Sequence, residues 1–157
     1  MPTRVFSQQP DLVAALPQLL AHARRFFAAE LEVVDASPPE RPDLARAHVT
    51  LRLEGARYPG RGTFRIEAVR PRPADQTAAE AAEQRGKAGG MAQLAGRCAA
   101  LWIITPEGEV TGSAELQLSA LLASVALGPV LPEDESTLYG VRGAMERAEK
   151  AANAANV

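Results

Sequence analysis

Residues 98–104 form an uninterrupted apolar run, Cys-Ala-Ala-Leu-Trp-Ile-Ile. A strand with one face in solvent alternates apolar and polar residues, so a run without alternation indicates a strand that is buried on both faces. We therefore predict a central strand over residues 98–105, with a layer of structure on each side of it. Pro106-Glu107-Gly108-Glu109 is typical of a turn, and Val110-Thr111 is typical of a short returning strand.

A second β signal precedes this run. Residues 48–54 and 62–69 contain strictly alternating apolar side chains and predict a hairpin with one buried face. Between them, Tyr58-Pro59-Gly60-Arg61 fits a type II turn, which favours proline at its second position and glycine at its third.

Apolar spacing of three and four residues predicts about four helices. They lie within residues 11–30, within residues 74–97 with a break at the glycines, over residues 114–127, and after Ser136. Together with the strands they indicate an α+β fold with an antiparallel sheet of about four or five strands, in a single domain over residues 1–157 whose tail, residues 151–157, is expected to fray.

The helix over residues 114–127 is apolar nearly all round. Leu, Val, Ile and Phe supply only about 22% of the chain, so large apolar side chains are scarce. A helix with apolar residues on every side must be buried against more than one layer, or against another subunit. The sequence therefore suggests that this chain self-associates.

The net charge of −2 conceals two oppositely charged segments. Residues 46–97 carry a net charge of +5, and residues 98–141 carry −6 with no basic residue. Such segments can attract a partner, or they can pack as neighbours and cancel each other.

The arginines of the hairpin, residues 46–72, raise the possibility of nucleic-acid binding. The register that we favour pairs Glu54 with Arg65 and Arg52 with Glu67, because opposite charges across a ladder stabilise it by about a few tenths of a kcal/mol. The arginines left over lie at opposite ends of the hairpin, which argues against one continuous phosphate-binding track.

Arg57, Tyr58 and Arg61 lie at the predicted tip of the hairpin. Arginine and tyrosine are enriched in the residues that dominate protein–protein binding energy. These three residues are the candidate partner-binding site, and an ordinary solvated turn is the alternative interpretation.

Two short stretches resemble parts of known families. Residues 84–90, Gln-Arg-Gly-Lys-Ala-Gly-Gly, are similar to the R-x-x-G-x-G pyrophosphate loop of the GNAT acyltransferases, with Arg85 and Gly90 matching and Ala88 in place of the first glycine. The resemblance implies a small acyl-CoA-dependent transferase that uses the 84–90 loop. Residues 101–127 are loosely similar to the hairpin and helix of roadblock-type dimerisation domains, a resemblance at the level of the fold that implies little about activity.

No catalytic or metal-binding motif supports an enzyme. The two histidines, His22 and His48, lie on different predicted elements, and Cys98 begins an apolar strand, where a free cysteine usually packs as a small hydrophobic side chain. We therefore expect a non-enzymatic interaction or adaptor domain that binds a protein partner, another copy of itself or both, with no cofactor or metal.

The cellular compartment follows from two further features. A lone cysteine excludes an intramolecular disulfide, which favours a reducing compartment. No run of about 18 apolar residues is present, so we expect no membrane span and a cytoplasmic protein.

Overall fold

The computed structural model describes residues 2–37 and 47–155. Its α+β fold confirms the predicted class, although it has more strands than expected. The strands are β1 (Thr3–Ser7), β2 (Glu30–Ser37), β3 (Ala47–Glu54), β4 (Gly60–Val69), β5 (Ala100–Gly112) and β6 (Val130–Leu131). The helices are α1 (Leu12–Phe27), α2 (Pro73–Gly86), α3 (Met91–Gly96), α4 (Ala114–Ala126) and α5 (Val141–Ala155).

The strands form one antiparallel sheet in the order β2-β3-β4-β5-β1-β6. β5 occupies a central position, as the apolar run predicts, with β4 on one side and β1 on the other. β1 lies between β5 and β6, so the first strand of the chain separates two strands from its second half.

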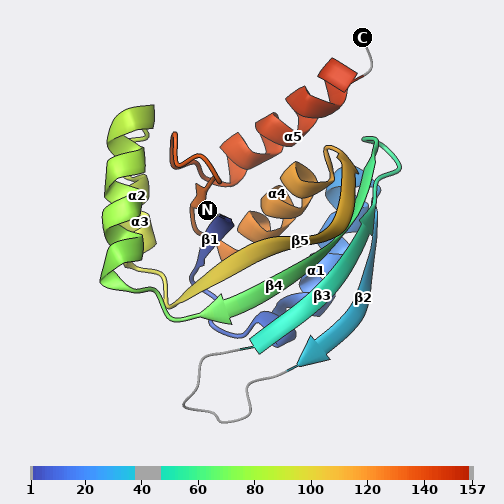
Figure 1. Cartoon of the computed structure of the whole chain (residues 1–157), viewed down its shortest axis with the longest axis horizontal. Coiled ribbons are helices and arrows are strands. Elements are labelled where there is room, and N and C mark those ends of the chain that lie inside the picture. Colours follow the sequence, from blue (N-terminus) through green and yellow to red (C-terminus); the bar gives the residue numbers. More distant parts are fainter. Residues whose placement is uncertain (1, 38–46, 156–157) are drawn as a thin grey trace.

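Helices cover the two faces of the sheet unequally. α1 and α4 pack along one face and bury its large core, and α5 lies against α4 (Figure 1). α2 and α3 cover the opposite face at the β5-β1-β6 end, where their alanines pack against Phe6, Leu101 and Leu131. The outward side chains of β3 and β4 are exposed or half-buried.

α4 is buried on nearly every side, as its composition predicts. The sheet and α1 cover one side of it, and α5 covers the other through Ala144 and Ala148 (Figure 1). Burial against several layers of the same chain therefore explains the all-round apolar helix, and a second subunit is not needed to cover it.

β5 continues through the residues predicted to turn, and this corrects the prediction of a turn at 106–109 with a returning strand. Pro106 pairs with Phe64 of β4, and a bulge takes up the extra residues around Gly108, whose φ is +75°. β1 pairs with β5 only as far as Ile104, so Pro106 lies where that side of β5 has no strand neighbour. A proline is tolerated there because it breaks no ladder on that side. The hairpin on which the roadblock resemblance rests is therefore absent.

The hairpin of β3 and β4 has the predicted buried face but a different register. Glu54 lies opposite Arg61 and Arg52 lies opposite Thr63, which corrects the predicted pairs of Glu54 with Arg65 and Arg52 with Glu67. The loop is tighter than expected, because the Gly55 N–H donates to the Gly60 carbonyl oxygen at 2.8 Å. The backbone hydrogen bond that closes the loop sets the register. It outweighs the preference for opposite charges across the ladder, which is only about a few tenths of a kcal/mol.

The position of Gly60 shows why this register is favoured. An added Cβ at Gly60 would lie 2.8 Å from the backbone nitrogens of Ser113 and Ala114, and its φ is +148°. The Ser113 N–H also donates to the Pro59 carbonyl oxygen at 3.1 Å. The hairpin loop is therefore docked on the start of α4.

The last helix begins later than predicted and continues further. α5 starts at Val141 rather than directly after Ser136, because Tyr139 forms a backbone bridge to Val130. The helix runs to Ala155, and Ala152 is buried. Residues 156–157 of the tail predicted to fray lie outside the described residues, as does residue 46 of the arginine-rich hairpin.

Candidate functional site

A pocket of about 470 Å³ lies where β1, the first turns of α4, the loop after β6 and α5 meet. This volume is within the range of roughly 300–1,000 Å³ that is common for ligand sites. Polar side chains from all four elements reach it: Thr3, Glu115, Ser119, Glu133, Asp134 and Arg147. Leu116, Pro132 and Tyr139 add an apolar part to its wall. We call this site the acidic pocket.

The carboxylates give the acidic pocket its character. Burial, and next the neighbouring Glu133 carboxylate, raise the pKa of Glu115 above its usual range, and a hydrogen bond from Thr3 opposes them. Asp134 is fully exposed, and hydrogen bonds from Ser136 lower its pKa. The pocket thus gathers the carboxyl groups of Glu115, Glu133 and Asp134, and Glu115 is half-buried.

Arg147 is the basic residue of the pocket. Its guanidinium carbon lies 4.5 Å from the centre of the Tyr139 ring, in a cation–π contact. Burial raises the pKa of Tyr139, and the Arg147 guanidinium opposes this. Tyr139 is held in place by its two backbone hydrogen bonds with Val130, at 2.7 and 3.1 Å. The arginine side chain itself is exposed on α5 and rests on a fixed ring.

The charges of the acidic pocket are not neutralised by ion pairs. Within residues 2–37 and 47–155, neither its three carboxylates nor Arg147 takes part in an ion pair within 4 Å. With three carboxylates and one guanidinium, the charged side chains of the pocket sum to −2. The site is therefore suited to a ligand group that brings a positive charge.

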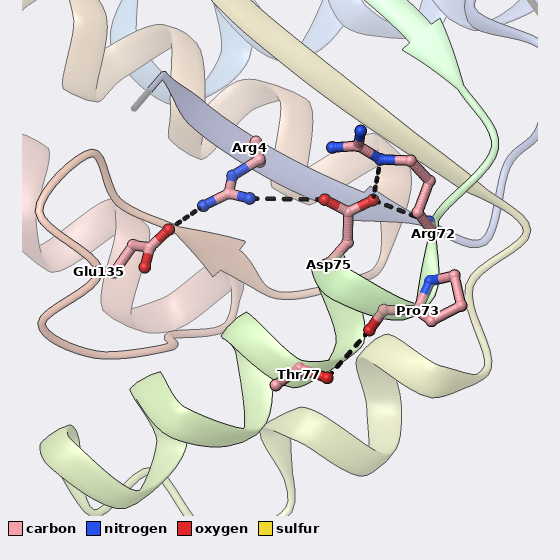
Figure 2. A network of polar contacts seen from close by, with 6 residues as sticks. All are labelled: Arg4, Arg72, Pro73, Asp75, Thr77 and Glu135. Atoms are coloured by element: carbon pink, nitrogen blue, oxygen red, sulfur yellow. Dashed lines mark hydrogen bonds and ion pairs between the residues drawn. The ribbon is translucent and has the colours of Figure 1, made fainter.

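The loop that forms one wall of the pocket is anchored by a set of charged residues that we call the Arg4 network. Arg4, at 4% exposure, contacts the carboxylate of Asp75 at 3.5 Å and pairs with that of Glu135 (Figure 2). The same Asp75 accepts hydrogen bonds from the backbone N–H of Arg72 at 2.8 Å and from its Nε at 3.4 Å. The network joins β1, the start of α2 and the loop, and so fixes one wall of the acidic pocket.

Of the three residues predicted at the hairpin tip, Arg57 and Tyr58 lie in the loop between β3 and β4, and Arg61 lies in β4. Tyr58 packs its ring edge-on against Phe27, with the ring centres 5.7 Å apart, and the guanidinium of Arg57 lies 5.5 Å from the Tyr58 ring. The Tyr58 carbonyl oxygen accepts a hydrogen bond from Gln117 at 3.1 Å. Arg61 is exposed at the start of β4. Arg57 and Arg61 thus face solvent, whereas Tyr58 serves partly to dock the loop.

Residues 84–86 are the end of α2, and residues 87–90 connect it to α3. The pyrophosphate loop that they resemble follows a strand, whereas here a helix precedes the glycines. Arg85, the matching arginine, donates a hydrogen bond to the Glu135 carbonyl oxygen at 3.0 Å. Arg85 is thus engaged in a contact within the chain, and the acyl-CoA-dependent transferase stays a prediction.

Two arginines of the hairpin strands form ion pairs with acidic residues. These pairs matter for the hypothesis that the hairpin binds nucleic acid. Arg52 contacts Glu32 of β2 at 3.1 Å, and Arg65 contacts Glu67 of its own strand at 3.2 Å. These pairs leave less unneutralised positive charge on the strands than the sequence alone indicates.

Cys98 and Ser124 are candidate nucleophiles, and neither is activated by its surroundings. Burial raises the pKa of the Cys98 thiol to about 11, and its Sγ donates to the Leu94 carbonyl oxygen at 3.4 Å. His22 Nδ1 lies 2.8 Å from Ser124 Oγ, but this hydroxyl donates to the Leu121 carbonyl oxygen at 2.6 Å rather than to the imidazole. In the part of the chain that the structure describes, no three His, Cys, Asp or Glu side chains are placed to hold a metal ion.

No helix among the described residues is long and apolar enough to cross a membrane. Comparisons with protein-family models, with curated proteins and with solved structures find no match to this chain. The site is therefore argued from its geometry alone.

Sequence reasoning missed both the acidic pocket and the Arg4 network. The acidic run Glu133-Asp134-Glu135 is visible in the sequence. By its position it is interpreted as acidic residues that stabilise the N-terminus of the following helix. In the structure this run lies in a loop ahead of α5, where Glu135 joins the Arg4 network while Glu133 and Asp134 line the pocket. No local pattern predicts this division, because it depends on residues as distant as Arg4 and Arg147.

Proposed function

We propose that this chain is a non-enzymatic interaction domain that binds another protein through the acidic pocket. The observation that carries the proposal is a concave site of about 470 Å³ in which polar groups from four elements converge and, among the described residues, none of its charged side chains forms an ion pair within 4 Å. A buried thiol with a raised pKa and a serine whose proton is held by a carbonyl oxygen support a binding role over nucleophilic chemistry.

Self-association is not part of this proposal. It was suggested by the apolar helix over residues 114–127, and that helix is covered by the sheet, α1 and α5 of its own chain. A second copy would need another surface on which to dock.

Site-specific photo-crosslinking in the native cellular extract tests the proposal. A benzophenone amino acid replaces Asp134 at the rim of the pocket, and a matched variant carries it at Glu80, which is exposed on α2 on the opposite side of the sheet. We expect defined cross-links to another protein from position 134 that are absent from position 80. Equal cross-linking at both positions, or none at position 134, would contradict the proposed function.

A further inference from the structure

We propose that the acidic pocket binds a basic side chain of the partner protein and that Arg147 is an internal occupant which this side chain displaces. The inference rests on the proposed function and names the chemistry that the pocket recognises. Two independent observations carry it: the shape and charge of the cavity, and the guanidinium that already lies on its aromatic residue.

The lining of the cavity matches an arginine or lysine side chain in two respects. Leu116, Pro132 and Tyr139 can contact the aliphatic part of such a side chain, which is apolar along its length. Glu115 and Glu133 can then accept hydrogen bonds from its charged end, and a charge-assisted hydrogen bond is stronger than a neutral one. An anionic ligand would meet the same carboxylates and be repelled.

The contact between Arg147 and Tyr139 shows that this wall accepts a guanidinium. The guanidinium carbon lies 4.5 Å from the ring centre, within the usual range for a cation–π contact. No ion pair within 4 Å holds Arg147 among the described residues, and its side chain is exposed. Its release therefore breaks the cation–π contact with Tyr139 and gives up the attraction to the Asp134 carboxylate, and it leaves the ring face and the carboxylates to an incoming cation.

This arrangement predicts that removing one residue of the pocket raises, rather than lowers, the affinity for the ligand. If Arg147 competes with the ligand, then Arg147→Gln strengthens the binding of a cation by removing both the competitor and a like charge. If Arg147 instead binds an anionic ligand, the same substitution weakens binding. The direction of the effect therefore distinguishes the two roles.

The experiment is a titration of the full chain, followed by amide NMR shifts, with three probes that share one backbone. N-acetyl-arginine amide is the cation, N-acetyl-citrulline amide is its neutral isostere, and N-acetyl-glutamate amide is the anion. We expect the arginine probe to shift the amides of Ser119 and Tyr139, and Arg147→Gln to raise its affinity about two- to fivefold, the range that an exposed cation–π contact accounts for. Added salt is expected to lower that affinity.

Two variants serve as controls. Arg142→Gln removes a positive charge from the same helix, at an exposed residue that contacts Glu146 at 3.6 Å and does not line the pocket, and we expect it to leave binding unchanged. Glu115→Gln with Glu133→Gln is expected to weaken the arginine probe, and the same spectra report whether each variant is folded.

Several results would overturn the inference: no binding of the arginine probe, equal binding of the citrulline probe, binding of the glutamate probe, or an Arg147→Gln variant whose affinity is unchanged or lower. If such a result accompanied specific cross-links from position 134, the interaction role would stand and only the basic side chain would be excluded. Failure of the cross-links would instead remove the proposed function itself.

Discussion

The loop between β6 and α5 separates two groups of charged residues. They differ in whether their charges form ion pairs. On one side, Arg4 and Asp75 of the Arg4 network are buried, and Arg4 contacts two carboxylates. On the other side the acidic pocket holds three carboxylates and one arginine around a cavity, and none of them takes part in an ion pair among the described residues. Charge that is paired and buried holds the fold together, whereas charge that is left unpaired around a cavity is available to a ligand.

The largest effect should come from removing the arginine of the buried group. Arg4→Met keeps an apolar stem but removes the buried cationic partner of the Asp75 carboxylate, which is 1% exposed and keeps only the exposed Arg72 guanidinium, at 3.4 Å. Breaking a buried pair from one side costs about 3–5 kcal/mol, and we expect a loss of that size in urea denaturation. A loss below about 1 kcal/mol would mean that the Arg4 network does not stabilise the fold as its burial indicates.

The carboxylate of the same pair should show a smaller effect. Asp75→Asn keeps the shape of the side chain and an oxygen that can accept the Arg72 N–H, while Arg4 retains Glu135. The variant loses the charge-assisted part of its bonds, so we expect a loss of about 2 kcal/mol in the same measurement. A larger loss than that of Arg4→Met would show that the hydrogen bond from the Arg72 backbone N–H at the start of α2, rather than the ion pair with Arg4, is the important contact.

In the acidic pocket, removing a charge should change the stability of the fold in the opposite direction. The pKa of Glu115 is raised in the folded chain, so ionising this carboxyl costs more in the folded state than in the unfolded state. Its unfavourable contribution is absent below the ordinary glutamate pKa, grows as the pH rises towards the folded-state value, and is complete above it. Glu115→Gln should therefore be at least as stable as the wild type at neutral pH, and this advantage should vanish as the pH falls below about 4.

Denaturation curves at several pH values check this prediction. If Glu115→Gln is clearly less stable than the wild type at neutral pH, the charge of Glu115 stabilises the fold, as the charges of the Arg4 network do. The acidic pocket and the Arg4 network would then not differ in their effect on stability.

The smallest effect is expected at an exposed ion pair of the sheet. Arg52→Met makes the same substitution as in the Arg4 network, but both partners of the 3.1 Å pair with Glu32 are more than half exposed. Exposed pairs are worth about 0–1 kcal/mol, so this variant serves as the matched control for Arg4→Met. Similar losses at the two arginines would show that burial does not distinguish them.

The elements that the sequence predicts well are those whose neighbours in space matter least. The alternating hairpin, the central strand and the helix over residues 114–127 each follow from a local apolar pattern, and each is present. The turn at 106–109 was wrong because β4 continues to pair with β5 beyond Pro106 and a bulge absorbs the glycine. The hairpin register was wrong because the docking of Gly60 on α4 involves residues more than 50 positions away.

The candidate site was beyond reach of the sequence for the same reason. Its charged residues come from β1, α2, α4, α5 and the loop after β6, and no spacing rule brings Arg4 to Glu135 or Arg147 to Tyr139. The hairpin tip was the more visible candidate, since Arg57, Tyr58 and Arg61 lie within five consecutive residues of the chain. The structure uses Tyr58 to pack against Phe27, a contact that only the tertiary fold reveals.

The place of β1 in the sheet has a consequence for biosynthesis. Residues 3–7 are synthesised well before their two neighbours in the sheet, which are β5, ending at Gly112, and β6, ending at Leu131. β1 must therefore remain without its native partners until β5 has been made, and unpaired strands favour aggregation. We expect nascent chains that stop before β5 to depend on chaperones, and the buried sheet to close late in synthesis.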